Sequence, residues 1–401
     1  MKITQGQFRA AADALAQILP MTQPADAVLS QYFRLNKQLG QQDRAFVADT
    51  VFALLRRRFG LEFHSGADSP RRLLLAYLHR VEGMSLRQLE PLFGPDADWA
   101  MALKTPREQP VPLSVSAELP PWLVEMLAPQ MNEEEILALG RALQQPAPLD
   151  LRINPLLTNR DEVLKNLAAD DIGAAATPLS PLGVRLTGKP ALNRHELFTS
   201  GKVEVQDEGS QLLCFLLAPK RREMVVDFCA GAGGKTLSIG AALRNTGRLY
   251  AFDTSAHRLD ALKPRLARSG LSNVYPVQIS SERDDRVKRL AGKIDRVLVD
   301  APCSGLGALR RRPESRWRRT PDDVEVLVGL QQVLLDVALE SVRPGGVVVY
   351  ATCSPVLAET SRVVEAVRGR RDDTDLLDSF QLWPHREGTD AMYAATLRRR
   401  G

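Results

Sequence analysis

Nearly continuous apolar strands alternate with helices from about residue 208 onward, and this pattern limits the folds open to the chain. The strand-like segments are MVVDF (224–228), RLYAFD (248–253), VYPVQ (274–278), DRVLVD (295–300) and GVVVYAT (346–352). Strands that are apolar on both faces are typical of a parallel sheet covered by helices on both sides. The pattern therefore predicts an α/β domain over residues 207–401, and ligands of such domains bind at the carboxyl ends of the strands.

The first of these strands runs into a glycine-rich loop, DFCAGAGGKTLS. Gly231, Gly233 and Gly234 let the backbone approach a ligand closely and turn into a helix N-terminus. A phosphate loop requires a glycine where Cys229 stands, and a dinucleotide loop requires one where Thr236 stands, so both nucleotide motifs fail by one residue. A turn that only connects strand to helix is the structural alternative, but three glycines in four residues favour a ligand-binding loop.

Asp253 ends the second strand, about twenty residues beyond the glycines. A carboxylate at this position can accept hydrogen bonds from both ribose hydroxyls of an adenosine ligand. The alternative role is the N-cap of the following helix, and one residue can serve both purposes. The position favours the ribose role.

Four cysteines are present, and two of them follow strands at the expected ligand-binding edge. Cys303 lies in DAPCSG after the fourth strand, and Cys353 lies in ATCS after the fifth. A buried cysteine is usually a small hydrophobe, which is our interpretation of Cys214, while at Cys229 the backbone matters more than the sulfur. The absence of C-x-x-C pairs predicts no metal site, and the low cysteine content fits a reducing cytoplasm.

The set DFCAGAGGKT, DAPCSG and YATCS, preceded by VQDEGSQL, resembles the RNA cytosine-5 methyltransferases of the Sun (Fmu) and Nop type. The resemblance covers roughly residues 120–401, and the combination of two cysteines is its specific part. It implies a Rossmann-like class I methyltransferase domain whose parallel sheet ends in a C-terminal antiparallel hairpin. It also implies S-adenosyl-L-methionine as the methyl donor and RNA, foremost ribosomal RNA, as the partner.

Methylation of cytosine at C5 requires covalent catalysis, because C5 is too weak a nucleophile to take a methyl group directly. A thiolate that adds at C6 makes the ring enamine-like, and β-elimination later frees the enzyme. By resemblance, Cys353 is the nucleophile and Cys303 assists release of the methylated product. Asp300 then hydrogen-bonds the N3/N4 edge of the base, and Lys235 approaches the base or stabilises charge near it. The structural alternatives are a cap after the strand for Asp300 and a solvated lysine at the helix start for Lys235.

The same resemblance places the methyl donor across the glycine loop, with Asp253 on the ribose. The candidate donor-binding residues of the loop are Cys229, Ala230, Gly231, Ala232, Gly233, Gly234 and Lys235, and Asp300 joins them. The family usually has an aspartate after its third strand to contact the adenine. Ser280 stands at that place, so we expect its hydroxyl or the backbone to take over the contact.

A cluster of arginines, RRRPESRWRR, directly follows the DAPCSG motif. We expect it to hold RNA phosphates beside the target base, with the tryptophan stacking or packing. The predicted RNA-binding residues are Arg310, Arg311, Arg312, Arg316, Trp317, Arg318 and Arg319. The alternative is a solvated basic loop with a core tryptophan. The overall balance of 53 basic against 48 acidic residues is too even to indicate a nucleic-acid partner by itself.

The first half of the chain is expected to consist of three segments. Residues 1–103 have helical apolar spacing and resemble the NusB-like domain of the bacterial small-subunit rRNA members. Residues 104–147 comprise a proline-rich linker and short helices. Residues 148–206 alternate strands with helices and predict a small α+β module of the RNA-recognition type. We expect these segments to position the RNA, with simple scaffolding as the alternative for residues 1–103.

The sequence as a whole therefore predicts a cytoplasmic, monomeric RNA methyltransferase. It contains no apolar run long enough to span a bilayer and no signal-peptide pattern. Two rival functions are considered. One is a P-loop-like NTPase, against which Cys229 counts, and the other is a catalytically idle RNA-binding factor of ribosome assembly.

Overall fold

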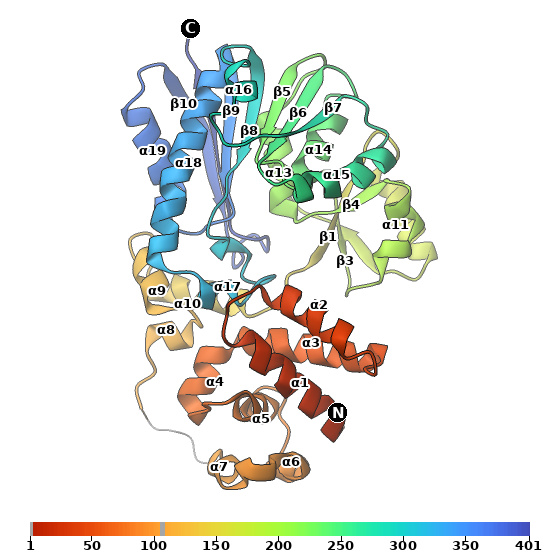
Figure 1. Cartoon of the computed structure of the whole chain (residues 1–401), viewed down its shortest axis with the longest axis vertical. Coiled ribbons are helices and arrows are strands. Elements are labelled where there is room, and N and C mark those ends of the chain that lie inside the picture. Colours follow the sequence, from red (N-terminus) through yellow and green to blue (C-terminus); the bar gives the residue numbers. More distant parts are fainter. Residues whose placement is uncertain (1–2, 105–108) are drawn as a thin grey trace. The chain divides into compact units, whose positions relative to one another are not determined.

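The computed structural model describes residues 3–104 and 109–401 and divides the chain into two compact units (Figure 1). Unit 1 comprises Met1–Pro146 and Ala308–Thr320, and unit 2 comprises Ala147–Gly307 and Pro321–Gly401. Part of the predicted linker, residues 105–108, lies outside the described residues. None of the described helices combines the length and the hydropathy that a bilayer span requires.

Unit 1 is helical throughout its described part, as the apolar spacing predicts for residues 1–103. Its first helix shows why: Phe8, Leu15 and Ile18 are buried on one face, and the Thr4–Gln7 capping box closes the helix start. The helices are α1 Gln5–Ile18, α2 Ala25–Leu35, α3 Gln41–Leu55, α4 Arg58–Ser65, α5 Pro70–Arg80, α6 Leu86–Phe93, α7 Ala97–Ala102, α8 Leu113–Ser116, α9 Pro121–Leu127, α10 Glu133–Leu143 and α17 Ser315–Arg318.

Unit 2 begins with the small α+β module that the sequence predicts. Four strands form an antiparallel sheet in the order β2-β3-β1-β4. The elements are β1 Leu149–Ile153, α11 Arg160–Ala169, β2 Ala174–Ala176, β3 Gly183–Leu186, α12 Glu196–Thr199 and β4 Val203–Val205. Strand β2 escapes prediction because three consecutive alanines carry neither apolar alternation nor strand propensity.

The rest of unit 2 is a seven-stranded sheet in the order β10-β11-β9-β8-β5-β6-β7. Its strands are β5 Met224–Phe228, β6 Arg248–Asp253, β7 Val274–Gln278, β8 Ile294–Asp300, β9 Val342–Thr352, β10 Thr374–Leu382 and β11 Met392–Arg399. The first five strands pair in parallel, whereas β10 and β11 form an antiparallel hairpin whose strand β11 also pairs with β9. The predicted Rossmann-like sheet with a C-terminal hairpin is therefore confirmed.

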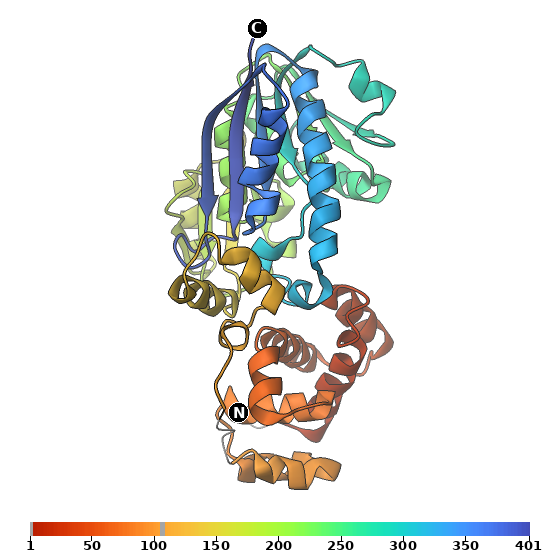
Figure 2. The ribbon, with the colours of Figure 1, turned by 90° about the vertical axis from the view of Figure 1, so that its left-hand side faces the viewer.

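Helices cover both faces of this sheet, because neighbouring strand residues point to opposite sides. In β8, for example, Val297 and Val299 are buried in one apolar core and Leu298 in the other. Helices α18 and α19 lie side by side over the first face, and α13, α14 and α15 supply the second core (Figures 1 and 2). These helices are α13 Glu208–Leu217, α14 Gly234–Ala242, α15 Ala256–Ser269, α18 Pro321–Ser341 and α19 Ser361–Gly369, and the short α16 spans Asp285–Lys288.

Candidate active site

The strand order places three loops at one edge of the sheet. The chain leaves β5 toward β6 and β7 and then returns to β8 on the other side of β5, so a crevice forms where the direction reverses. Strands β8 and β9 are paired, with Asp300 opposite Ala351. The glycine loop after β5, the Cys303 loop after β8 and the Cys353 loop after β9 therefore meet at this edge.

The two cysteines at the edge are in direct contact. The Sγ atoms of Cys303 and Cys353 lie 3.2 Å apart, within hydrogen-bond distance for sulfur. This hydrogen bond to Cys353 and the burial of the side chain raise the pKa of Cys303 above the ordinary thiol value. The raised pKa favours the protonated form of the Cys303 thiol.

Lys235 and Asp300 form an ion pair beside the cysteines, with 2.7 Å between Nζ and Oδ2. Burial lowers the pKa of Lys235, but the Asp300 carboxylate and the nearby Cys353 and Asp227 outweigh it, so that the net direction is upward. Lys235 is therefore a partly buried ammonium group that pairs with a carboxylate and interacts electrostatically with a thiol. The solvated lysine at the helix start, considered from the sequence, does not describe this environment.

Glu359 joins the two cysteine loops and was not predicted from the sequence. Its fully buried carboxylate accepts hydrogen bonds from the backbone N–H of Ser304 at 2.7 Å and from the hydroxyl of Ser354 at 2.6 Å. Gln331 on α18 donates to the same carboxylate at 3.1 Å. Because each serine follows a cysteine, Glu359 fixes the two thiol-bearing loops relative to each other. The repeated Cys-Ser pairs were the only signal in the sequence that pointed to such a partner.

Gly307 links the Cys353 loop to the β10–β11 hairpin by backbone hydrogen bonds. Its N–H donates to the carbonyl of Cys353 at 2.9 Å, and its own carbonyl accepts from the N–H of Ala391 at 3.0 Å. A Cβ at this position would lie 2.8 Å from the Cys353 carbonyl oxygen and 2.2 Å from that of Ala391. Only glycine therefore fits between the hairpin and the Cys353 loop.

The glycine loop holds a strained backbone that Asp253 stabilises. Cys229, Gly231 and Gly233 have φ angles of 70°, 59° and 81°, in the left-handed region. One carboxylate oxygen of Asp253 accepts from the Gly231 N–H at 2.7 Å, and the other accepts from the Ser255 N–H at 2.8 Å. The N-cap of α15 is Ser255 and not Asp253. The Asp253 carboxylate instead holds the glycine loop through its bond to Gly231.

The loop residues fit S-adenosylmethionine. The first N–H groups of α14 have no acceptor within the helix, so they can bind a carboxylate such as that of the methionyl part. Each oxygen of Asp253 retains a lone pair for a ribose hydroxyl, because it accepts only one backbone bond. Within the described residues, no group of three or more histidine, cysteine or acidic side chains is arranged to hold a metal ion.

Asp227 and Cys229, at the end of β5 and the start of the glycine loop, both have raised pKa values. Burial raises the pKa of Asp227 to about 7, and its Oδ1 is buried without a hydrogen-bond partner among the described residues, whereas Thr236 donates to Oδ2 at 2.6 Å. Burial also raises the pKa of Cys229, to which the neighbouring carboxylates of Asp300 and Asp253 add. The Cys229 thiol therefore stays protonated, which agrees with a role for its backbone.

Ser280, the predicted adenine contact, is exposed and engaged with an acid that the sequence reasoning missed. Its N–H and its hydroxyl donate to one oxygen of Asp284 at 2.9 Å and 3.0 Å. Backbone hydrogen bonds from Ser280 and Arg286 lower the pKa of Asp284 to about 2. A carboxylate thus lies next to the position where the family usually has one, four residues later in the chain.

The arginine cluster belongs to unit 1, although the sequence pattern assigns it to the catalytic domain. Arg316 is 1% exposed, and its Nη1 donates to the carbonyl of Glu118 at 2.5 Å. Arg310 is 5% exposed. Trp317 donates to a backbone carbonyl of α3, and its ring packs 4.3 Å from that of Phe59.

The prediction of direct RNA contacts is therefore wrong for Arg310 and Arg316, because buried guanidinium groups do not reach a phosphate. The packing of Trp317 matches the core tryptophan that was the alternative. RNA binding by the other arginines, Arg311, Arg312, Arg318 and Arg319, stays a prediction.

Comparison with known proteins follows the same division of the chain. Residues 214–398 match the family described as 16S rRNA methyltransferase RsmB/F, and residues 119–193 match its ferredoxin-like domain. A putative methyltransferase of Mycobacterium tuberculosis is 48% identical over 221 residues, which cover 50% of this chain and 46% of the relative. The chain thus spans about half the length of that relative.

Two further similarities extend the comparison. The probable ribosomal RNA small subunit methyltransferase B of Bacillus subtilis is 30% identical over 306 residues, covering 72% of this chain and 68% of the relative. The crystal structure of a methyltransferase homolog protein from Pyrococcus horikoshii superimposes with a TM-score of 0.60 at 27% identity, covering 70% of this chain and 100% of that one.

Proposed function

Because the chain belongs to the RsmB/F family of methyltransferases, we propose that it methylates C5 of a cytidine in RNA, foremost ribosomal RNA. S-adenosylmethionine, the methyl donor of this family, supplies an electrophilic methyl sulfonium. The observation that carries the proposal is the contact between two cysteines, 3.2 Å apart, beside a partly buried lysine at the ligand-binding edge of the sheet. Cysteine used only for packing has no need of such neighbours.

In the proposed reaction Cys353 is the nucleophile. Its thiolate forms a bond from Sγ to C6 of the cytosine, which makes C5 electron-rich enough to take the methyl group. Lys235 supports this step, because its ammonium interacts electrostatically with Cys353. The target base must be unpaired or flipped out of a helix to reach the sulfur.

Cys303 has a separate role in the release step. Its raised pKa keeps it protonated while Cys353 forms the adduct, and a thiol of high pKa becomes a strong base once it is deprotonated. We infer that Cys303 first gives its own proton to solvent and then accepts the C5 proton. The electron pair of the C5–H bond re-forms the C5–C6 double bond, and Cys353 leaves C6 as a thiolate. Asp300, held by Lys235, contacts the N3/N4 edge of the same base.

The proposal is tested by methyl transfer from radiolabelled S-adenosylmethionine to unmodified rRNA. Cys353→Ala is expected to abolish incorporation, whereas Cys303→Ala is expected to accumulate a covalent protein–RNA adduct that survives denaturing electrophoresis. Cys214→Ala is the matched control, because this cysteine is buried in α13 and has no part in the proposed reaction, and it should remain active. Unchanged incorporation in Cys353→Ala contradicts the nucleophile assignment. RNA binding without incorporation in the unmodified protein supports the idle assembly factor instead.

A further inference from the structure

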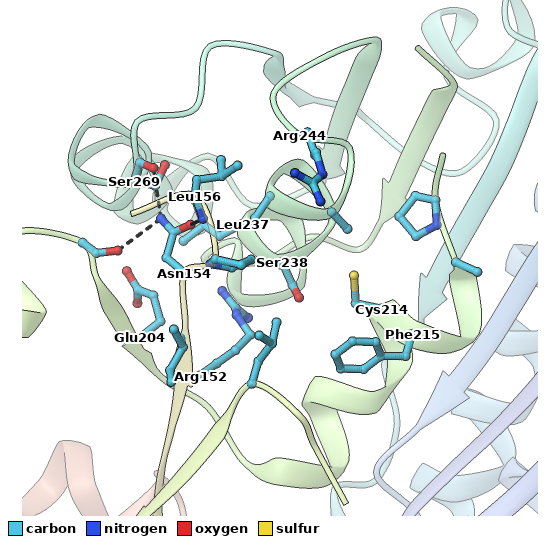
Figure 3. A pocket seen from close by; sticks show the side chains of 18 residues that line it. Arg152, Asn154, Leu156, Glu204, Cys214, Phe215, Leu237, Ser238, Arg244 and Ser269 are labelled. Atoms are coloured by element: carbon cyan, nitrogen blue, oxygen red, sulfur yellow. Dashed lines mark hydrogen bonds between the residues drawn. The ribbon is translucent and has the colours of Figure 1, made fainter. Parts of the chain in front are cut away.

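A second cavity opens in unit 2, between the small antiparallel sheet and the helices that follow it. It has a volume of about 410 Å³ and is lined by β1, β4, α13 and α14. Figure 3 shows Arg152, Asn154 and Glu204 on one side of the cavity and Cys214 and Phe215 on the other. None of the predicted catalytic or donor-binding residues lines it, so the cavity is separate from the candidate active site.

The charge of Arg152 lacks a carboxylate partner of its own. This side chain is 5% exposed, and its Nη1 donates to the carbonyl of Gly234 at 2.6 Å and to the amide oxygen of Gln206. Both acceptors are neutral. The hydrogen bonds of this guanidinium within the described part of the chain are made by Nη1, and neither Nε nor Nη2 is a fully enclosed atom that lacks a partner.

The nearest carboxylate is already committed to other arginines. Glu204 pairs with Arg265 at 2.8 Å and with Arg268 at 2.6 Å. Three guanidinium groups, those of Arg152, Arg265 and Arg268, thus share one carboxylate around the cavity. Three cations that share one carboxylate leave an excess of positive charge, which is costly in a poorly solvated place, and an anion that enters the cavity offsets this cost.

The rest of the lining combines apolar side chains with the polar residues Asn154, Ser238, Arg244 and Ser269. Leu182, Leu237 and Ala241 belong to the apolar part of the lining. Phe215 lies on the same side of the cavity as Cys214 (Figure 3). The volume is at the lower end of the range of about 300–1,000 Å³ that small-molecule sites occupy. The cavity therefore suits a ligand with one negatively charged end and a short apolar body.

From this combination of a buried arginine and apolar walls, we infer that unit 2 has a second ligand site, which binds a small organic anion with an apolar portion. The charged end pairs with Arg152, and the apolar body lies between α13 and α14. Binding is direct and reversible and involves no covalent step.

The site is linked to the donor loop through the same arginines. Arg152 holds the carbonyl of Gly234, and Arg265 holds that of Ala232 at 2.6 Å. Both carbonyls belong to the glycine loop, so an anion that draws Arg152 toward the cavity changes the affinity for S-adenosylmethionine. This coupling rests on the proposed donor site, whereas binding of the anion does not.

The site is tested with hexanoate as the probe, using saturation-transfer NMR and calorimetry on the full chain. Acetate carries the charge without the body, and hexan-1-ol carries the body without the charge. We expect hexanoate to bind at least about tenfold more tightly than either one, since both parts of the cavity contribute. Equal binding of hexanoate and hexan-1-ol, or no binding of hexanoate, overturns the inference.

Variants test where hexanoate binds and separate a local effect on binding from a general loss of folding. Arg152→Met should weaken hexanoate about tenfold or more and leave hexan-1-ol unchanged. Ala242→Phe fills the mouth of the cavity from an exposed position and keeps Arg152, so it should also abolish binding. Ala168→Phe, on an exposed position of α11 outside the cavity, is the matched control. Hexanoate binding that persists in Ala242→Phe refutes the location.

The coupling has its own readout. The Kd of S-adenosylmethionine is measured with and without saturating hexanoate, in the unmodified protein and in Ala242→Phe. A change that occurs only in the unmodified protein supports the link through Arg152. If hexanoate binds and the donor affinity does not change, the coupling is wrong and the anion site stands. If the donor does not bind at all, the proposed function fails independently of the anion site.

Discussion

Replacing Glu359 by alanine tests whether one buried carboxylate holds the two cysteine loops together. The substitution removes four hydrogen bonds, from the N–H and the hydroxyl of Ser304, the hydroxyl of Ser354 and the side-chain amide of Gln331. The hydroxyls can rotate and Gln331 keeps its bond to the carbonyl of Pro302, but the Ser304 N–H is fixed in the backbone. It loses the carboxylate that accepts from it.

The magnitude follows from these bonds. A buried hydrogen bond to a charged group contributes about 1.5–3 kcal/mol, and we assign about 1 kcal/mol to each of the other three lost bonds. Removing a buried charge returns part of its desolvation cost, which lowers the sum. We therefore expect Glu359→Ala to reduce the free energy of unfolding by about 3–5 kcal/mol, a large share of the ~5–15 kcal/mol typical of a folded protein.

The assay is urea unfolding followed by circular dichroism, combined with the methyl-transfer assay on folded protein. Glu359→Gln should cost much less, because its amide oxygen still accepts from Ser304 and its amide nitrogen can donate to the serine hydroxyls. Glu365→Ala, an exposed glutamate on α19, is the matched control and should be neutral. An alanine variant that unfolds like the control and keeps full activity refutes the reasoning.

Three further perturbations test other parts of the structure. Gly307→Ala should disturb the Cys353 loop and lower kcat more than S-adenosylmethionine affinity, because the new Cβ meets two backbone carbonyls; equal kcat contradicts this. Between pH 4 and 7 the free energy of unfolding should fall by about 4 kcal/mol, because folded Asp227, with a pKa of about 7, retains the proton that the unfolded chain loses near 3.8. Asp227→Asn should remove this fall. A pH profile that the substitution leaves unaltered contradicts the prediction. Arg316→Ala should lower the Tm without changing the salt dependence of RNA binding, because the side chain is buried. Arg312→Ala, at an exposed position, should change that salt dependence and leave the Tm unchanged. The reverse result restores the RNA role of Arg316.

Much of the site followed from short-range sequence patterns. Apolar runs such as MVVDF and GVVVYAT determined a parallel sheet, because strands that are apolar on both faces have to be covered twice. The cysteines that follow the fourth and fifth strands then had to lie at one edge, since parallel strands end on the same side. The positions of Cys303, Cys353 and the glycine loop were therefore accessible from spacing alone.

Other features depended on partners that are distant in the chain. No local pattern distinguishes Arg316 from a solvated arginine, yet it is buried because its partner Glu118 lies 198 residues away. The same holds for Glu359, whose bond to Ser304 spans 55 residues. Periodicity tells which side of an element faces inward. Which charged group it meets there is decided only when separate elements pack, and the sequence alone left that open.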